Sequence, residues 1–331
     1  MLNLADLSTY RTLNYVERGN QSDVTEFILR GFRIFYPFQI GLLFVVFLVI
    51  YMVILLGNSV IVVVTVLDSA LHTPMYFFLR NLSFVEICYT SVTLPKMVAN
   101  CLAQDGSISF TGCAVQMYFF LLLGGTECFL LAAMAYDRYM AICNPLHYTL
   151  IVNREVCARM VAGSWLVNIP VHFGQTYLVF SLPFCRSREI NHFFCDIPPL
   201  LELSCVDTYR NKIAMFMAAL LFIITPFILI VISYIKIAST VLKMPSSEGR
   251  QKTFSTCSSH LTVVILFYCS GMIAYLRPKS RNSEDTEKLL SLFYTIVTPL
   301  FNPFIYSLRN KEVKASLRKL VAIWWSCRKG N

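Results

Sequence analysis

Long stretches without charged residues dominate this chain and constrain it more than any other feature. A helix that crosses a bilayer needs roughly 20 predominantly apolar residues. Uncharged runs of about this length lie between Arg33 and Asp68, Asp105 and Asp137 (apart from Glu127), Arg159 and Arg186, Lys212 and Lys236, Lys252 and Arg277, and Lys288 and Arg309. A further segment, 74–98, contains Arg80, Glu86 and Lys96, but its basic residues lie near its ends, where they can reach the headgroups. The pattern predicts seven transmembrane helices.

Composition supports this reading and excludes a soluble protein. Of the 331 residues, 56% are apolar and 14% are charged, whereas a soluble chain carries about 25% charged residues. The net charge of +9 does not indicate a nucleic-acid-binding protein, because no soluble domain remains to carry a basic face. We predict an all-α membrane protein, a seven-transmembrane helix bundle with a short C-terminal amphipathic helix.

The predicted organisation has three parts. Residues 1–33 form an extracellular N-terminal segment, residues 34–310 the transmembrane domain, and residues 311–331 a cytoplasmic amphipathic helix and tail. The first part contains no long apolar run, so no cleavable signal peptide is expected. Asn20 begins an N-glycosylation sequon, which fits a lumenal N-terminus. Seven spans place the C-terminus on the side of the membrane opposite to the N-terminus. A small excess of Lys and Arg on the cytoplasmic segments agrees with this orientation.

The expected C-terminal helix covers residues 311–325. Its apolar face would comprise Val313, Leu317, Leu320, Val321 and Trp324, and its basic residues are free to meet anionic headgroups. Cys327 is a candidate for palmitoylation, although an unmodified thiol is an equal alternative.

Four of the twelve cysteines lie on the outer side. Cys113 begins the third span, and Cys185, Cys195 and Cys205 lie in the loop between the fourth and fifth spans. Disulfides persist in an oxidising compartment. Four cysteines allow three pairings, between which the sequence alone does not choose. Zinc binding with His192 as an added ligand is disfavoured, because the spacings match no usual zinc pattern.

Short motifs lie at the ends of the predicted spans. They are Gly57-Asn58 in the first, residues 71–79 (LHTPMYFFL) in the second, Asp137-Arg138-Tyr139 in the third, Ser233-Tyr234 in the fifth, residues 252–260 (KTFSTCSSH) in the sixth and residues 299–310 (PLFNPFIYSLRN) in the seventh. This set resembles the signature of the odorant receptors of the rhodopsin-like G-protein-coupled class, over residues 25–320. The Asp-Arg-Tyr and Asn-Pro-x-x-Tyr motifs indicate only the class. The second-span and sixth-span strings, together with the cysteine-rich loop, indicate odorant receptors.

The resemblance implies roles for particular residues. It pairs Cys113 with Cys195 and Cys185 with Cys205, and it implies that Asp137 holds Arg138 at rest. On activation Arg138 would regroup with Tyr234 and Tyr306. The full set that the resemblance assigns to coupling is Asp137, Arg138, Tyr139, Tyr234, Asn302, Pro303 and Tyr306. The implied partner is a heterotrimeric stimulatory G protein of the olfactory type, which raises cAMP at the plasma membrane.

Glu86 and Glu127 are two carboxyl groups deep in the membrane. They cannot both be ionised and unpaired, so either one is protonated or a cation lies between them. The resemblance favours a sodium ion held with help from Asn58 and Asn302, and it implies no other cofactor. Two neutral acids hydrogen-bonded to their neighbours are the alternative.

The resemblance places a ligand pocket in the outer half of the bundle, under the cysteine-rich loop. Its candidate lining is Phe120, Leu121, Gly124, Gly125, Ala218, Phe222, Tyr268, Tyr275 and Thr295. Such a mostly apolar lining suits a small, largely apolar volatile molecule with one polar group. No carboxylate among them resembles an amine anchor, which disfavours biogenic amines.

Other functions fit less well. A multi-pass transporter often shows internal repeats, which this chain lacks, and would leave the Asp137-Arg138-Tyr139 motif unexplained. An enzyme is not expected, because His147 and His260 have no evident catalytic partner. A rhodopsin-like chemosensory receptor for a non-odorant ligand remains an alternative that sequence does not separate from an odorant receptor.

Overall fold

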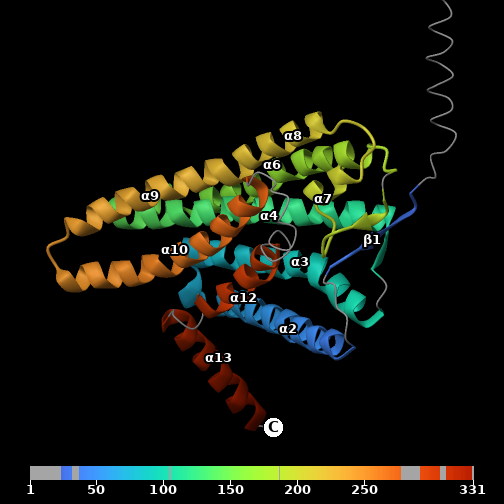
Figure 1. The fold of residues 1–331 in the computed structure, drawn as a ribbon. Helices are drawn as coiled ribbons and strands as arrows, with labels where there is room; N and C mark the ends of the chain where they lie inside the picture. The colour runs from blue at the N-terminus through green and yellow to red at the C-terminus, as the bar shows by residue number, and fades with distance from the viewer. Residues whose placement is uncertain are drawn as a thin grey trace, which may run out of the picture.

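The computed structural model describes residues 24–31, 37–103, 106–185, 187–276, 291–305 and 311–329. Figure 1 shows long helices packed side by side as a bundle. The seven spans are, in order, α2 (Pro37–Leu67); α3 (Pro74–Ala103); α4 (Phe110–Cys143); α6 (Arg154–Phe180); α8 (Tyr209–Ala219), η2 (Leu220–Ile224) and α9 (Thr225–Leu242), which form one span; α10 (Ser247–Leu276); and η3 (Phe293–Val297) with α12 (Thr298–Pro303). The predicted seven-helix fold is confirmed.

Among the described residues, three helical stretches are long and apolar enough to cross a membrane on length and composition alone. They are Phe38–Leu67, Phe110–Cys143 and Tyr209–Leu242. The α2 helix shows what surrounds the bundle, because Leu42, Val49, Leu56 and Val63 recur every seventh residue and are each half or more exposed. An apolar stripe of this kind on a bundle surface indicates contact with lipid.

Local signals explain where several helices begin. The Ser109 hydroxyl accepts a hydrogen bond from the Gly112 N–H at the start of α4, and the Asn153 side chain accepts one from Val156 at the start of α6. Both residues are typical N-caps that satisfy otherwise unpaired N–H groups. Helix α3 begins at Pro74, a residue favoured in the first turn because its missing N–H is not needed there.

Helix α4 is the central element of the bundle. It packs against α3, α6 and α9, and it supplies the deepest buried residues of the main core, including Leu130, Leu131 and Met134. Many of the side chains along α4 are therefore buried against a neighbouring helix. This position makes α4 the element that connects the outer and inner ends of the receptor.

Span five changes its helical form at η2, directly before Pro226. Proline has no N–H and cannot continue the α-helical hydrogen-bond pattern. Here the Thr225 N–H bonds the Leu220 carbonyl, five residues earlier, and the Thr225 hydroxyl donates to the same oxygen at 2.9 Å. Wide turns of this π type recur at functional sites. A second π turn, η3, precedes Pro299 in span seven.

A small sheet at the outer end was not predicted from the sequence. Strand β1 (Glu26–Leu29) pairs antiparallel with β2 (Ser107–Ser109) and parallel with β3 (Glu189–Ile190). Phe27 in β1 is fully buried in a second core cluster below the sheet. The sheet therefore ties the described part of the N-terminal segment to the loops after spans two and four.

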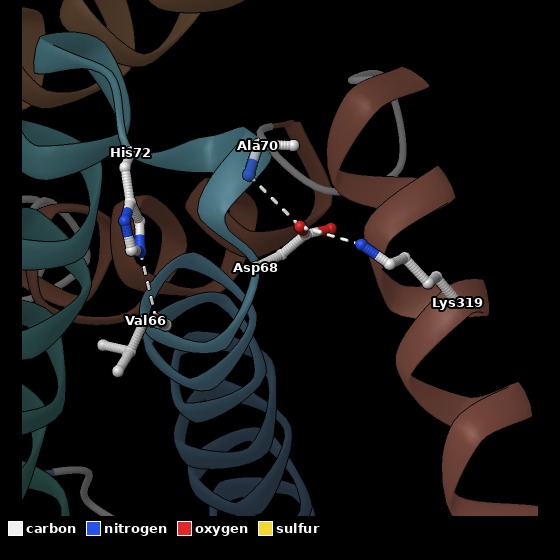
Figure 2. Close-up of polar contacts among 5 residues, drawn as sticks. All are labelled: Val66, Asp68, Ala70, His72 and Lys319. Carbon is white, nitrogen blue, oxygen red and sulfur yellow. Dashed lines mark hydrogen bonds and ion pairs between the residues drawn. The ribbon is translucent and has the colours of Figure 1, made fainter.

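The predicted C-terminal helix is present as α13 (Lys311–Lys329), which extends away from the bundle beside α2 (Figure 1). Val313 is fully buried, whereas Leu317 and Val321 are exposed on the surface. Lys319 Nζ lies 3.2 Å from Asp68 Oδ1 (Figure 2). Hydrogen bonds from the Ser316 hydroxyl and the Ala70 N–H, with a smaller effect of Lys319, lower the pKa of Asp68. These contacts attach α13 to the turn η1 (Ser69–Leu71). The Cys327 side chain lies outside the described residues.

Candidate functional site

An apolar cavity of about 90 Å³ lies in the outer half of the bundle, between α4, α6, the α8–η2 segment and α10. Its lining is Tyr89, Phe120, Leu121, Gly124, Gly125, Cys128, His172, Gln175, Ile197, Met215, Ala218, Ala219, Phe222, Ile223, Phe267, Tyr268 and Gly271. Seven of the nine candidates named from the sequence are in this set. Thr295 is instead buried elsewhere in the core, and the Tyr275 side chain lies outside the described residues.

The cysteine-rich loop covers the outer side of the cavity. Ile197, at the start of α7 (Ile197–Glu202), contributes directly to the lining. The Phe194 ring packs on Phe120 with ring centroids 4.7 Å apart. The Cys195 N–H donates to Gln116 Oε1 of α4 at 3.0 Å, which fixes the loop over the cavity.

Two disulfides hold this loop. The structure joins Cys113 to Cys195, with Cα atoms 5.5 Å apart, and Cys185 to Cys205, with Cα atoms 5.7 Å apart. These are the two pairings that the resemblance implies. The first attaches the loop to the outer end of α4, and the second closes the loop on itself.

A polar edge on α6 was missed in the sequence reasoning. His172 Nδ1 lies 2.8 Å from Gln175 Oε1, and His172 Nε2 lies 3.0 Å from Asn168 Oδ1. The amide nitrogens have their own partners, since Asn168 Nδ2 donates to the Ser164 carbonyl and Gln175 Nε2 to the Ala214 carbonyl. Polar residues at 168, 172 and 175 recur on one face of an apolar helix, and that spacing could have identified them.

Gly125 allows α4 to approach this polar edge. A Cβ atom at residue 125 would lie 2.0 Å from Asn168 Oδ1 and 2.8 Å from His172 Nε2, distances at which side chains must move. The glycine therefore has a specific packing role, and any side chain there would displace His172 or Asn168.

Tyr268 forms the inner wall of the cavity. Its ring is fully buried, and its hydroxyl donates to the Cys128 backbone carbonyl at 2.9 Å. This bond connects α10 to α4 one residue after Glu127. A change in the cavity can therefore alter the contact between the third and sixth spans.

The two buried carboxyl groups lie next to each other below the cavity. Glu86 and Glu127 are close enough to interact electrostatically, and the Asn302 amide donates to Glu86. Asn58 donates to the Ile54 carbonyl at 3.1 Å and to the Pro299 carbonyl at 3.5 Å, so it lies against the same seventh span.

Several buried oxygen atoms of this cluster accept no hydrogen bond. They are Asn58 Oδ1, Glu86 Oε2, Glu127 Oε1 and Asn302 Oδ1. Within the described ranges no group of three or more His, Cys, Asp and Glu side chains could hold a metal ion. The possible ligands at this cluster are oxygen atoms of two carboxyl groups and two amides. Oxygen ligands of this kind suit a hard cation.

The inner end of α4 differs from the expectation in one respect. Asp137 is not ion-paired to Arg138 in the described structure; it accepts a hydrogen bond from the Tyr148 hydroxyl at 2.7 Å. Tyr148 begins the short helix α5 (Tyr148–Ile151), which positions its hydroxyl beneath α4. The Tyr148 hydroxyl therefore takes one carboxylate oxygen of Asp137, while Arg138 interacts with the carboxylate through its charge. The role of Asp137 in holding Arg138 at rest stays a prediction.

Arg138 lies among the inner ends of spans three, five and six. Its Nε atom is buried with no hydrogen-bond partner, and its charge acts on both Tyr234 and His260. The Tyr234 hydroxyl and His260 Nδ1 are 2.6 Å apart, joining α9 to α10. Tyr139 is partly buried in the adjacent inner cluster, and Pro303 is buried at the end of α12. Tyr306 lies outside the described residues, as does Asn20.

The structure combines an apolar cavity at the outer end of α4 with a partly buried arginine at the inner end of the same helix. In a seven-helix bundle, this arrangement is typical of a receptor of the rhodopsin-like G-protein-coupled class. A family model described as olfactory receptor matches residues 47–323. The chain belongs to the olfactory receptor family. The family is one of receptors.

Individual relatives match across most of their length. Human olfactory receptor 10A5 is 54% identical over 302 residues, which cover 91% of this chain and 95% of that protein. Human olfactory receptor 10A2 is 55% identical over 282 residues, covering 85% and 93%. Human olfactory receptor 10A3 is 54% identical over 305 residues, covering 92% and 97%. These long matches extend over the cavity, the cysteine-rich loop and the inner end of α4.

Proposed function

We propose that this receptor binds a small, largely apolar volatile molecule in the α4–α6–α10 cavity and activates an olfactory-type stimulatory G protein, which raises cAMP. The single observation that carries the proposal is the apolar cavity with one polar edge, formed by His172 and Gln175. Its volume of about 90 Å³ suits a small molecule and excludes a peptide.

The polar edge favours a ligand with one hydrogen-bonding group. A neutral imidazole donates from only one ring nitrogen, but both nitrogens of His172 face amide oxygens. One nitrogen therefore has a lone pair without a donor opposite it. A ligand hydroxyl that donates to this nitrogen would satisfy it, while the rest of the ligand contacts Phe120 and Phe222.

The proposed location is the plasma membrane, with the N-terminus outside and the C-terminus inside. The two disulfides and the small sheet lie at the same end of the bundle, and disulfides persist on the oxidising side of the membrane. Arg138 then lies at the cytoplasmic end of α4, where a G protein can reach it.

The test is a cAMP-reporter screen of the full-length receptor against a panel of small volatiles. We expect responses to compact alcohols and related molecules with one polar group. A receptor that reached the cell surface and responded to none of the volatiles, but to a non-odorant metabolite, would favour the chemosensory alternative.

Replacing His172 by Phe should weaken responses to hydroxyl-bearing agonists. The phenyl ring fills the same space but offers no nitrogen, so one hydrogen bond is lost and the EC50 should rise by about twofold to tenfold. Responses to an isosteric agonist without the hydroxyl should not weaken. Phe173→Leu is the matched control, because Phe173 is the next residue on α6 and is exposed on the bundle surface. An equal loss for both agonists would indicate a packing effect and count against the polar contact.

We also propose that a sodium ion binds among Glu86, Glu127, Asn58 and Asn302. The four buried oxygens that accept no hydrogen bond support this, because each can coordinate a hard cation. Bound sodium would neutralise part of the carboxylate charge and connect spans one, two, three and seven.

The sodium proposal predicts a salt-specific stability that Glu127→Gln removes. A ligand that binds only the folded state raises its stability with concentration. The purified receptor should unfold at a higher temperature in sodium chloride than in choline chloride of equal ionic strength. The Glu127→Gln variant should show no difference between the salts. Equal melting temperatures of the wild-type receptor in both salts would instead support two neutral, hydrogen-bonded acids.

A further inference from the structure

A second cavity, distinct from the proposed odorant site, opens at the inner ends of α3 and α6 beside η1. It has a volume of about 410 Å³, and its lining includes His72, Thr73, Arg80 and Arg154. Arg80 lies in the second turn of α3, and Arg154 is the first residue of α6. Two guanidinium groups from separate helices therefore reach one hollow at the membrane boundary.

Neither guanidinium is neutralised by a carboxylate in the described structure. Arg80 lies over the Phe77 ring at 5.3 Å, and no ion pair or hydrogen bond is formed by either arginine among the described side chains. A cation over an aromatic ring keeps its charge available on its other face. The cavity therefore presents uncompensated positive charge.

The acidic side chains of the neighbouring elements have other partners. Asp68 accepts from the Ala70 N–H and from Lys319, each at 3.2 Å (Figure 2). Glu155 pairs with Arg159 at 2.5 Å, and Glu312 accepts from the Tyr76 hydroxyl at 2.6 Å. His72 is bonded through Nε2 to the Val66 carbonyl at 3.1 Å, which fixes its ring at the edge of the cavity (Figure 2). Within the described part of the chain, no carboxylate therefore pairs with either arginine.

Apolar side chains continue along α3 from the cavity toward the middle of the span. Phe77 lines the cavity, and Phe84 lies seven residues further along α3, on the same face of the helix and half exposed. A ligand with its charged group between Arg80 and Arg154 could place an acyl chain along Phe84. Free phosphate or a nucleotide would make no use of this path.

We propose that this cavity binds the phosphorylated inositol headgroup of an anionic lipid of the cytoplasmic leaflet. Arg80 and Arg154 contact phosphate oxygens through their planar N–H pairs, which match the geometry of a phosphate group. A phosphorylated inositol ring carries phosphate groups beyond the one that links it to the lipid, whereas phosphatidylserine has only the linking phosphate. The Thr73 hydroxyl is placed to bond the ring hydroxyls. Basic pockets between helices on the cytoplasmic side of membrane proteins have the chemistry to bind such headgroups. The occupied cavity would hold α3, α6 and η1 together beside α13.

The test uses the full-length receptor in nanodiscs. Binding of a fluorescent phosphatidylinositol bisphosphate is measured against discs in which phosphatidylserine supplies the same total charge. Arg80→Gln/Arg154→Gln should weaken binding by about thirtyfold. Arg159→Gln is the matched control, because it lies on α6 and is exposed and already paired to Glu155. It should change binding by less than about twofold.

Two further arms keep the result interpretable. Arg80→Lys/Arg154→Lys keeps the charge but loses the planar N–H pairs, so an intermediate loss supports phosphate recognition in a folded receptor. Soluble inositol trisphosphate should bind more weakly than the lipid, because it cannot use the Phe84 path. Equal binding of the soluble headgroup would overturn the assignment to a membrane lipid. Equal losses in the Arg159→Gln control, or equal binding of phosphatidylserine, would overturn the cavity as a specific site.

Discussion

Replacing Arg138 by alanine is expected to abolish the cAMP response while the receptor still reaches the cell surface. Arg138 lies fourteen residues beyond Gly124 of the cavity wall on the same helix, so the two are separated by roughly 20 Å at a rise of 1.5 Å per residue. A small ligand cannot contact both. The signal must therefore pass through a rearrangement of the bundle that both sites influence.

The surroundings of Arg138 suit such a rearrangement. Its Nε is buried without a partner, and Asp137 beside it accepts a hydrogen bond from the Tyr148 hydroxyl through one carboxylate oxygen. A guanidinium at this depth needs a partner or water. A second state in which the Tyr234–His260 pair opens would offer it a new partner. A ligand that binds this state more tightly shifts the population toward it.

The measurement is cAMP accumulation together with surface labelling of tagged receptor. Arg159→Ala is the matched control, because this arginine is also near the inner side but is exposed and paired only with Glu155. Agonist affinity of Arg138→Ala should change by no more than the lost coupling, about 1–3 kcal/mol. A well-expressed Arg138→Ala receptor that signals normally would show that activation does not pass through this residue.

The spans and much of the cavity could be predicted because they depend on local pattern and order along the chain. Uncharged runs locate membrane helices whatever packs against them. The family resemblance then placed Phe120, Gly124 and Phe222 on the helix faces that meet in the cavity. Both disulfide pairings followed from the same resemblance, whereas cysteine spacing alone left three possibilities.

The remaining features depend on contacts between distant segments. Asp137 pairs with Tyr148 because a short loop helix turns back beneath α4, and no local pattern encodes that return. Strand β1 is recognisable only when its partners, β2 and β3, are in place. Asn168, His172 and Gln175 are spaced so that they lie on one face of α6. The sequence of an apolar helix does not show which of its faces meets lipid and which meets the cavity, so these residues could not be assigned to the cavity.

Removing the disulfide that joins α4 to the cysteine-rich loop is expected to prevent most of the receptor from reaching the cell surface. Cys113 and Cys195 are fully buried and 82 residues apart in the sequence. In the chain-entropy account, a closed loop of this length contributes about 4–5 kcal/mol, against about 3 kcal/mol for the shorter Cys185–Cys205 loop. A loss of this size is a large part of the stability of a typical folded domain.

The experiment compares Cys113→Ala/Cys195→Ala with Cys185→Ala/Cys205→Ala by surface labelling and by the melting temperature of purified receptor. Double variants avoid a single unpaired thiol that could exchange with the other disulfide. The 113/195 variant should lose more, because its loop is longer and because, of the two disulfides, it is the one that joins the segment with Phe194 and Ile197 to α4. Cys269→Ala is the control, since Cys269 is an exposed free thiol on α10 and its removal should leave both measurements unchanged. If the 185/205 variant proved the more damaging, closure of the loop on itself, and not its attachment to α4, would be the main support of the cavity.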